Sequence, residues 1–519
     1  MTIRTRLRTT AASLAVAALI AGCGIQETSS STAAGTTVAT TTSSTERTEE
    51  ATSSTGAQEA SDESTTEEPI GVVGLTTHAD GDEADDDEQS AVAVALADGA
   101  GTTADNGVQV TTTEEGTDLV TVTEAGTYVL SGTLGDGQVV VAVPEEEDVT
   151  VVLDGVDITS SLGPALQVSS AEDATVVLAD GSDNSLTDPE TYAQTDAGVD
   201  EETGEEVDAP NAALYSTADL TIAGDGSLTV QGNGGDGITS KDGLVILSGD
   251  LDVIAADDGI RGKDFLSVQG GTVTVTAQDD GLTSDNTEDG TGIIALSGED
   301  TTVSVAAGDD AVTAENVIDL VGGTLTVSGS LEGLESARII VEGGSTDVTA
   351  TDDALNAVSD TITPSVEISG GSLTLTSDGD GLDSNGVVTM TGGTVVVNGP
   401  TMDGNGAIDV DGDFLVSGGT LTALGSAGMM MAPSTDSDQA SIAAALSGVV
   451  AAGQTLTVTD AQGSVVAEVP VTKDTASLVL STTDLEAGQT YTVSAGDTEL
   501  ASTTAGEYAL GGMGGGPRP

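Results

Sequence analysis

The sequence predicts an all-β protein whose main domain is a parallel β-helix with coils of about 22 residues, followed by a small C-terminal β unit. Two patterns favour this fold. Glycine-containing turns recur at a nearly constant spacing, and the short stretches between them alternate apolar and polar residues. A third observation is that no sustained apolar stripe of helical period occurs, so little helix is expected.

The first repeated turn begins with an acidic residue, most often followed by glycine. Asp236-Gly-Ile-Thr-Ser-Lys-Asp242 is followed, at steps of 22 residues, by Asp258-Gly-Ile-Arg-Gly-Lys-Asp264 and Asp280-Gly-Leu-Thr-Ser-Asp-Asn286. Later steps vary in length. The leading residues of the whole series are Asp236, Asp258, Asp280, Asp310, Glu332, Asp353, Asp380 and Asp403.

A second turn, Gly-Gly-Thr or Gly-Gly-Ser, recurs between the acidic turns, as at Gly270-Gly271-Thr272. One coil therefore contains three short strands, predicted near Gly259–Gly262, at Phe265–Val268 and at Thr272–Thr276. Valine, isoleucine and leucine are expected to point inward, and threonine and serine outward. About ten coils should form a right-handed helix, because parallel crossovers are nearly always right-handed. A β-sandwich and a β-propeller are the alternatives, although a propeller repeat has about 40–45 residues.

Residues 1–22 have the features of a secretory signal: three arginines, a short apolar run at Ala11–Ile20 and small residues before Cys23. Ile20-Ala-Gly-Cys23 resembles the lipobox of bacterial lipoproteins, in which the cysteine is acylated. The resemblance implies that a lipid on Cys23 anchors the chain in the bilayer, outside the cytoplasm at the cell surface. Cys23 is the only cysteine, so no internal disulfide is expected.

Composition divides the remainder of the chain. Residues 23–105 are rich in serine, threonine and acidic residues and are predicted to be a disordered linker. The β-helix is predicted over 106–432, a β cap or appended β domain over 433–510, and a flexible tail over 511–519. Acidic insertions at Thr187–Pro210 and Asn286–Gly292 interrupt the repeat, and the second is expected on the same edge as the aspartates. The C-terminal strands are predicted at Thr455–Thr459, Val465–Val471, Leu478–Ser481 and Thr490–Ser494, with Met429–Met431 as apolar packing at the cap.

The charge of the chain excludes one large class of partner. There are 87 acidic residues against 10 basic ones, which gives a formal net charge of −77. A nucleic-acid-binding protein needs cations to neutralise phosphates, so that function is excluded. Such an acidic surface repels itself unless cations screen it, and calcium is the obvious partner outside the cell. No glycine-rich cofactor loop lies between a predicted strand and helix, which argues against nucleotide-dependent chemistry.

Stacked coils should place the leading aspartates in one column and Asp257, Asp279, Asp309 and Asp352 in a second column beside it. Like charges at about 4.8 Å repel, and calcium would relieve this because it takes about six to eight oxygen ligands. The alternative is that Asp-Gly is favourable turn chemistry with solvated charges, which explains single aspartates better than pairs in register. The predicted calcium ligands are Asp236, Asp257, Asp258, Asp264, Asp279, Asp280, Asp285, Asp309 and Asp310.

Basic residues are rare in the β-helix region, and three of the four lie close together in the repeat. Lys241, Arg261 and Lys263 are the predicted carbohydrate-binding residues, because they could hold the carboxylate of an acidic sugar while calcium bridges it to the aspartates. Local ion pairing with the aspartates is the alternative. The chain has no tryptophan, five tyrosines and two phenylalanines, so it offers little aromatic surface for neutral sugars.

Several stretches resemble the bacterial family of carbohydrate-binding domain-containing proteins, namely Asn211-Ala-Ala-Leu-Tyr-Ser216, Asp257-Asp-Gly-Ile-Arg-Gly-Lys-Asp264 and Gly270-Gly-Thr-Val-Thr-Val-Thr-Ala277. The resemblance covers about Asn106 to Ser426. It implies a calcium-containing parallel β-helix that binds polygalacturonate and cellulose and is similar in shape to pectate lyases. Later coils depart from the pattern, so calcium is expected mainly around Asp257–Asp285 and least beyond Ser330.

The function predicted from these features is a cell-surface lipoprotein that binds acidic polysaccharide such as pectin, and possibly cellulose, through a calcium-loaded aspartate edge. The first alternative is a calcium-dependent polysaccharide lyase, with Lys263 or Arg261 as the base. A hydrolase using paired carboxylates, for example Asp257 with Asp280, is a weaker alternative. A passive surface rod is the third. No catalytic residue is assigned, because the edge repeats one theme over many coils, and a monomer is expected.

Overall fold

The computed structural model describes residues 91–99, 102–104, 106–114, 116–193, 198–199, 206–207 and 209–507. Within these ranges the chain is all-β, and it forms a β-solenoid of about 12 turns whose bridges are mainly parallel. The predicted fold class is therefore confirmed. The described residues contain no helix long and apolar enough to cross a membrane. The predicted signal at 1–22, the lipid site at Cys23 and the tail at 511–519 lie outside the described residues.

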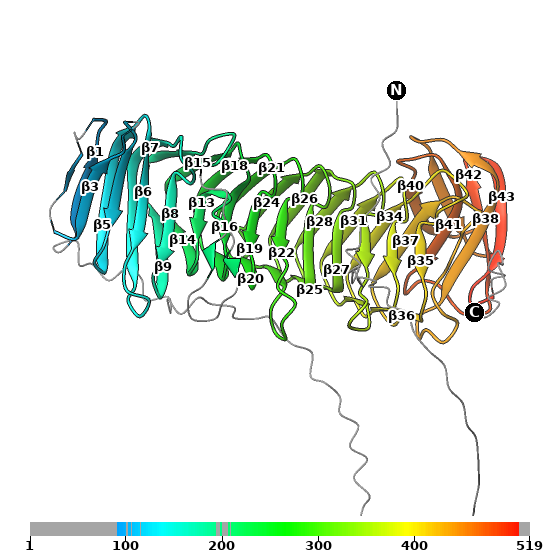
Figure 1. The fold of residues 1–519 in the computed structure, drawn as a ribbon. Helices are drawn as coiled ribbons and strands as arrows, with labels where there is room; N and C mark the ends of the chain where they lie inside the picture. Colours follow the sequence, from blue (N-terminus) through cyan, green and yellow to red (C-terminus); the bar gives the residue numbers. More distant parts are fainter. Residues whose placement is uncertain are drawn as a thin grey trace, which may run out of the picture. The chain divides into compact units, whose positions relative to one another are not determined.

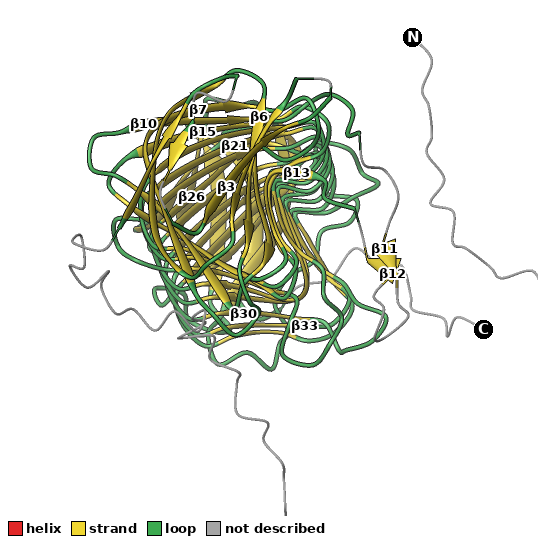
Figure 2. Cartoon of the chain, turned by 60° about the vertical axis from the view of Figure 1, so that its left-hand side comes forward, coloured by secondary structure: helices red, strands yellow, loops and turns green. Residues whose placement is uncertain are grey.

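Most coils contribute one short strand to each of three faces, and four longer strands each run across two faces. The strands of successive coils lie side by side (Figure 1). In the coil that follows Asp258, these strands are β19 (Ile260–Gly262), β20 (Phe265–Val268) and β21 (Thr272–Ala277), close to the predicted ranges. They pair in parallel with the equivalent strands of the next coil, β22 (Leu282–Ser284), β23 (Ile293–Leu296) and β24 (Thr302–Ala306). Seen from 60° further round, the strands surround a common interior (Figure 2).

The three faces can be followed by their strands. The first face contains β4 (Asp118–Val122), β6 (Gly137–Ala142), β8 (Leu166–Ser170), β13 (Ala212–Ser216), β16 (Asp236–Ser240), β19, β22, the start of β25 (Val312–Leu320) and of β27 (Leu334–Val341), β29 (Leu355–Ala357), β32 (Leu382–Ser384) and β35 (Ile408–Val410). The second face contains β1 (Val92–Leu96), the start of β5 (Gly126–Leu134) and of β7 (Val149–Thr159), β9 (Asp173–Leu178), β14 (Asp219–Gly224), β17 (Gly243–Ile246), β20, β23, the ends of β25 and β27, β30 (Ser365–Ile368), β33 (Val387–Met390) and β36 (Phe414–Val416). The third face contains the ends of β5 and β7, β10 (Asp183–Thr187), β15 (Ser227–Gly232), β18 (Asp250–Ala255), β21, β24, β26 (Thr324–Gly329), β28 (Ser345–Thr349), β31 (Ser372–Thr376), β34 (Thr394–Asn398) and β37 (Thr420–Gly425).

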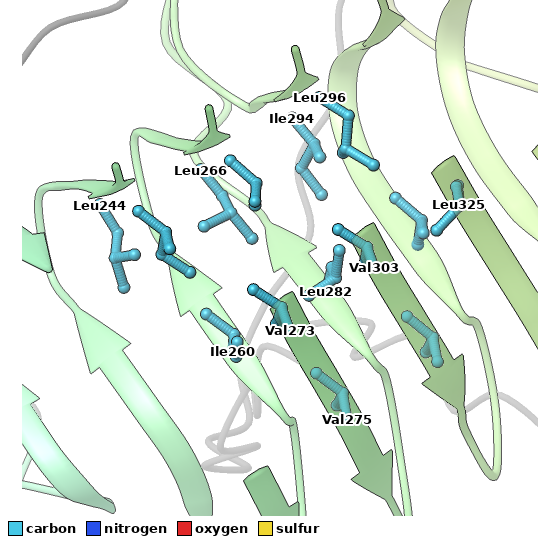
Figure 3. Packing of buried hydrophobic residues seen from close by; sticks show 14 of the residues in the cluster. Leu244, Ile260, Leu266, Val273, Val275, Leu282, Ile294, Leu296, Val303 and Leu325 are labelled. Carbon is cyan, nitrogen blue, oxygen red and sulfur yellow. The ribbon is translucent and has the colours of Figure 1, made fainter. Parts of the chain in front are cut away.

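Inward-facing aliphatic side chains stack along the solenoid and form its core. Leu244, Leu266 and Ile294 occupy the same position in successive coils, and all three are fully buried (Figure 3). Ile260 and Leu282 form an equivalent stack on the first face. Complete burial of such a side chain contributes about 1.5–3 kcal/mol, so the repeated stacks supply the stability that a single coil lacks.

The Gly-Gly turns are required by the backbone. The second glycine of each turn has a positive φ, a conformation that side chains with a Cβ rarely adopt. In five of the six turns, a Cβ on the first glycine would overlap a carbonyl oxygen of the preceding coil, as Gly270 would with Leu247, whereas Gly322 has room for one. The positive-φ glycines of this series are Gly271, Gly323, Gly344, Gly371, Gly393 and Gly419.

The structure corrects the predicted N-terminal boundary. β1 lies inside the predicted linker, yet Val92 to Leu96 pair in parallel with Tyr128 to Gly132 of β5. The linker prediction failed there because Val92-Ala-Val-Ala-Leu96 is a short apolar stretch that becomes a strand only when a neighbouring coil completes its hydrogen bonds. β2 (Thr103–Ala104) and β3 (Val108–Thr112) complete this end by antiparallel pairing. Residues 198–199 (β11) and 206–207 (β12) form a separate antiparallel pair.

The predicted C-terminal β unit is present. β38 (Ser441–Val450) and β37 pair antiparallel with β41 (Thr475–Ser481), and β40 (Val465–Pro470), β39 (Thr455–Thr459), β42 (Thr490–Ala495) and β43 (Thr498–Thr504) form a four-stranded sheet. This unit has its own buried cluster, separate from the solenoid core. Met430 and Met431 pack against the solenoid core, as predicted for the methionine run, whereas Met429 is exposed.

One loop lies on a different corner from the one predicted. The segment Asn286–Gly292 connects β22 to β23, so it leaves the solenoid between the first and second faces. The leading aspartates precede the first face, at the corner between the third and first faces. The prediction was wrong because β22 lies between Asp280 and this loop. The strand carries the chain along the first face, so the loop begins at the next corner.

Candidate functional site

The corner between the third and first faces carries the column of acidic residues that the repeat predicts. The backbone N–H of Gly237 donates to the carbonyl of Asp258, and the same link joins Gly259 to Asp280 and Gly281 to Asp310. Continuing links through Glu332, Asp353 and Asp380 place seven acidic residues in consecutive coils. We call this set the leading column: Asp236, Asp258, Asp280, Asp310, Glu332, Asp353 and Asp380.

Asp403 does not belong to the leading column, which corrects the predicted series. The N–H of Gly381 donates to the carbonyl of Gly406, so Gly406 occupies the next position. The N–H of Gly406 also donates to Oδ1 of Asp380 at 2.5 Å. The 23-residue spacing misled the assignment because the turn before β35 is lengthened by a few residues, and only strand pairing reveals this.

Carboxylates of the leading column are held by the main chain of the following coil. Oδ1 of Asp258 accepts from the N–H of Asp280 at 3.3 Å, and Oδ1 of Asp280 accepts from the N–H of Asp310 at 2.9 Å. In the same way, Oδ1 of Asp353 accepts from the N–H of Asp380 at 2.5 Å. Asp236 has additional partners, because its Oδ2 accepts from the Thr239 hydroxyl at 2.7 Å and the Asn211 amide at 2.8 Å.

A second acidic column lies beside the first. Carbonyl-to-amide links connect Asp257 to Asp279 and Asp279 to Asp309, but Leu331 then separates Asp309 from Asp352. Carboxylate oxygens of the two columns converge in two sets whose ligand atoms lie within 4.8 Å of one another. These sets are Asp257, Asp258 and Asp279, and Asp279, Asp280 and Asp309.

Burial and mutual repulsion make ionisation of the leading column unfavourable. Burial, followed by the charges of Asp236 and Asp257, raises the pKa of Asp258 to about 7. Burial also raises the pKa of Asp280 to about 7 and that of Asp236 to about 6. A divalent cation beside these groups would favour their charged forms and lower these pKa values.

A third acidic set lies further along the solenoid, in the region where the sequence favoured calcium least. Asp353, Asp380 and Asp383 bring carboxylate oxygens within 4.8 Å of one another. Asp383 was missed because it lies on the outward row of the first face, three residues after Asp380, rather than in the turn. In the preceding coils, the Asn356 amide donates to Glu332 at 2.9 Å and to Glu335 at 3.1 Å.

The predicted ligands Asp264 and Asp285 are separated from the other seven. They follow the first-face strands and lie at the corner between the first and second faces, where Asp264 accepts from the Asn286 amide. Asp285 pairs with the Arg261 guanidinium, whose Nε lies 3.3 Å from Oδ1. Neither aspartate belongs to the three converging carboxylate sets.

The three predicted cations are likewise divided. Arg261 lies in the middle of β19, on the outward row between Thr239 and Thr283, and its charge acts on both Asp236 and Asp258. Lys241 and Lys263 directly follow the paired residues Ser240 and Gly262, so they occupy equivalent positions in adjacent coils at the opposite corner. We call the corner between the third and first faces the acidic corner. The guanidinium of Arg261 pairs with Asp285 at the opposite corner, but its charge, unlike those of the two lysines, also acts on Asp236 and Asp258 of the acidic corner.

The donor atoms define what this corner can hold. The converging ligands are all carboxylate oxygens, which suit a hard cation such as calcium, and the hydrogen bonds to the main chain use only one oxygen of Asp258 and Asp280. The carboxylate sets therefore fit calcium. Arg261 adds a planar donor that recognises carboxylates in a bidentate manner.

Comparison with known proteins adds the following. A family model described as carbohydrate-binding domain-containing protein matches residues 115–363 and 323–511. A protein of the same description from Acetivibrio thermocellus is 38% identical over 136 residues, which are 26% of this chain and 45% of the relative. The match thus spans less than half of that relative's length. A solved structure of a polysaccharide lyase-like protein from C. thermocellum, as a gadolinium derivative, is 31% identical, with a TM-score of 0.39, covering 50% of this chain and 95% of that one.

Proposed function

The chain belongs to the carbohydrate-binding domain-containing family, and from this premise we propose that it binds acidic polysaccharide of the polygalacturonate type with calcium as the bridging ion. In this proposal, Asp257, Asp258, Asp279, Asp280 and Asp309 hold calcium at the acidic corner. Arg261 binds a sugar carboxylate. The further proposal that Cys23 carries a lipid places this binding at the cell surface.

The observation that supports the proposal most directly is the position of Arg261 beside the acidic sets. A polyanion would be repelled by a chain with a formal net charge of −77, so an acidic sugar needs local positive charge. Arg261 supplies one such charge on the outward row, and calcium at the neighbouring carboxylates supplies another. Repetition of the carboxylate sets in adjacent coils would let one polymer bind several ions at once.

The test is retention of the purified chain on immobilised polygalacturonate, in calcium and in chelator, while the absorbance of unsaturated products is followed. Calcium-dependent retention without an absorbance rise supports a binding protein. A steady rise that Arg261→Ala or Lys263→Ala abolishes would make the protein a lyase instead. If the chain shows neither retention nor product, a passive surface rod is the better account. A parallel experiment with cellulose in place of polygalacturonate tests binding of a neutral polysaccharide.

A further inference from the structure

The second acidic column has three aspartates in consecutive coils and then stops. Links from a backbone N–H to the carbonyl of the preceding coil join Gly235, Asp257, Asp279, Asp309, Leu331, Asp352 and Gly379, in this order. We call Asp257, Asp279 and Asp309 the outer aspartates. Asp257 and Asp279 are exposed and Asp309 is half-buried, so a ligand in solution can reach them.

A different residue closes each end of this set. At one end stands Gly235, where a Cβ would lie 2.0 Å from the carbonyl oxygen of Asn211, so no side chain fits. At the other end Leu331, which is 42% exposed, puts an apolar side chain where a fourth carboxylate would stand. Asp352 is therefore separated from the outer aspartates, and the converging carboxylate sets that include them end at Asp309.

A buried hydroxyl in the middle coil points independently to a ligand. Thr283 stands three residues after Asp280, as Thr239 stands after Asp236, on the same outward row of the first face. The Thr239 hydroxyl donates to Asp236 at 2.7 Å. Thr283 is only 6% exposed, and its hydroxyl has no hydrogen-bond partner among the described residues. Such a group is uncommon, and its oxygen suits a calcium ion or a sugar hydroxyl beside Asp280.

The spacing of the outer aspartates suits an extended sugar chain. Successive coils are about 4.8 Å apart, and one unit of an extended 1,4-linked hexose polymer advances the chain by a similar length. A uronate chain that runs along the solenoid axis would therefore place one carboxylate beside each coil. A chain that runs across the coils would meet the aspartates of one coil only.

We propose that the polysaccharide site spans three coils, with a uronate chain lying along the solenoid axis, one unit over each of the outer aspartates, and that Leu331 ends the site. This inference rests on the proposed function and specifies the direction and length of its ligand. Leu331 determines specificity because its side chain offers no oxygen to a cation, so a fourth uronate finds no bridge.

The first experiment is calorimetric titration of the full chain, in calcium, with galacturonate oligomers of one to six units. We expect the affinity to rise by about tenfold or more from one unit to three, and by no more than about fourfold from three units to six, the gain from alternative registers alone. This length series needs no variant.

The second experiment uses Leu331→Asp, which would join Asp309 to Asp352 in one continuous column. It should raise the affinity of the hexamer by about tenfold and that of the trimer by no more than about threefold. Calcium titration without sugar should show more bound ions than in the unmodified chain. Leu247→Asp is the matched control, since Leu247 is 41% exposed at the corner between the second and third faces and the change in charge is identical.

An affinity that keeps rising steeply from trimer to hexamer in the unmodified chain would overturn the three-coil site. Equal responses of Leu331→Asp and Leu247→Asp, in hexamer affinity and in bound calcium, would overturn the role of Leu331. In both cases calcium-dependent binding itself would stand, whereas failure of every oligomer to bind in calcium would overturn the proposed function as well. Melting curves in chelator check that both variants are folded.

Discussion

The carboxylate of Asp280 accepts a hydrogen bond from the backbone N–H of Asp310, one coil further along the solenoid, at 2.9 Å. The same relationship joins Asp258 to Asp280 and Asp353 to Asp380. Backbone amides therefore position carboxylates that repel one another. Because an asparagine side chain keeps an acceptor oxygen but carries no charge, removal of charge and removal of a hydrogen-bond acceptor can be separated by mutation.

Replacement of Asp280 by asparagine retains the acceptor oxygen and removes the charge. Without calcium, we expect the free energy of unfolding to rise by about 1 kcal/mol, because repulsion from Asp258 and Asp309 is relieved. In calcium, the stabilisation that the ion provides should be smaller than in the unmodified chain. Melting curves in calcium and in chelator measure both effects, with Asp250→Asn on the outward third face as control. Identical shifts with and without calcium would contradict the ligand assignment.

The acidic corner should make stability depend on pH. Asp258 and Asp280 have folded-state pKa values raised to about 7, against about 3.9 in an unfolded chain. Their contribution to stability is therefore fully present below about pH 4 and is lost as the pH rises through about 7. In chelator, the urea midpoint should be higher at pH 5 than at pH 8. Calcium should reduce this difference, and a midpoint that rises with pH in chelator would refute the raised pKa values.

Replacement of Arg261 by alanine should weaken binding of polygalacturonate in calcium by about tenfold, since a bidentate partner for the sugar carboxylate is lost. Arg261→Lys should recover only part of the affinity. The measurement is the dissociation constant by calorimetry. Arg338→Ala removes a half-buried cation from the second face and should leave the constant unchanged. A loss of equal size in Arg338→Ala would indicate that total charge, rather than the position of Arg261, controls binding.

Leu282→Ala tests the stacked core. Leu282 is fully buried between Ile260 and Val312 of the adjacent coils, so its truncation leaves a cavity and should lower the free energy of unfolding by about 2–5 kcal/mol. Chemical denaturation measures the change. Thr274→Ala, at an exposed position of β21, should change it by no more than about 0.5 kcal/mol. Similar losses for the two variants would show that the inward and outward assignments are wrong.

Much of the architecture follows from local pattern. Strand β20 coincides with the predicted Phe265–Val268, and β21 extends the predicted Thr272–Thr276 by one residue. The positive φ of Gly271 explains why the Gly-Gly marker repeats. These strands and turns can be predicted from the sequence because a solenoid depends mainly on contacts between neighbouring coils. Each coil therefore needs the same pattern of apolar residues and turn glycines. The pairing of Asp258 with Asp280 could be predicted for the same reason.

The positions of Asp383, Asp403 and Asp285 could not be predicted, because each depends on where a turn ends. A longer turn moves Asp403 out of the leading column. Asp383 joins Asp353 and Asp380 because it stands on the outward row of the first face, in the strand that follows the turn. The salt bridge between Arg261 and Asp285 likewise requires a side chain to cross between coils.

The sequence by itself determined the repeat, the three-strand coil and the stacked acidic turns, because period, glycine and apolar alternation are properties of neighbouring residues. Only the tertiary structure decided which carboxylates converge, and that Arg261 pairs with Asp285 while its charge also acts on Asp236 and Asp258. It also decided that Oδ1 of Asp319 is buried without a hydrogen-bond partner among the described residues. The physical reason is that such contacts join residues through strand register across coils of unequal length, and register is set by hydrogen bonding in the assembled solenoid rather than by spacing along the chain.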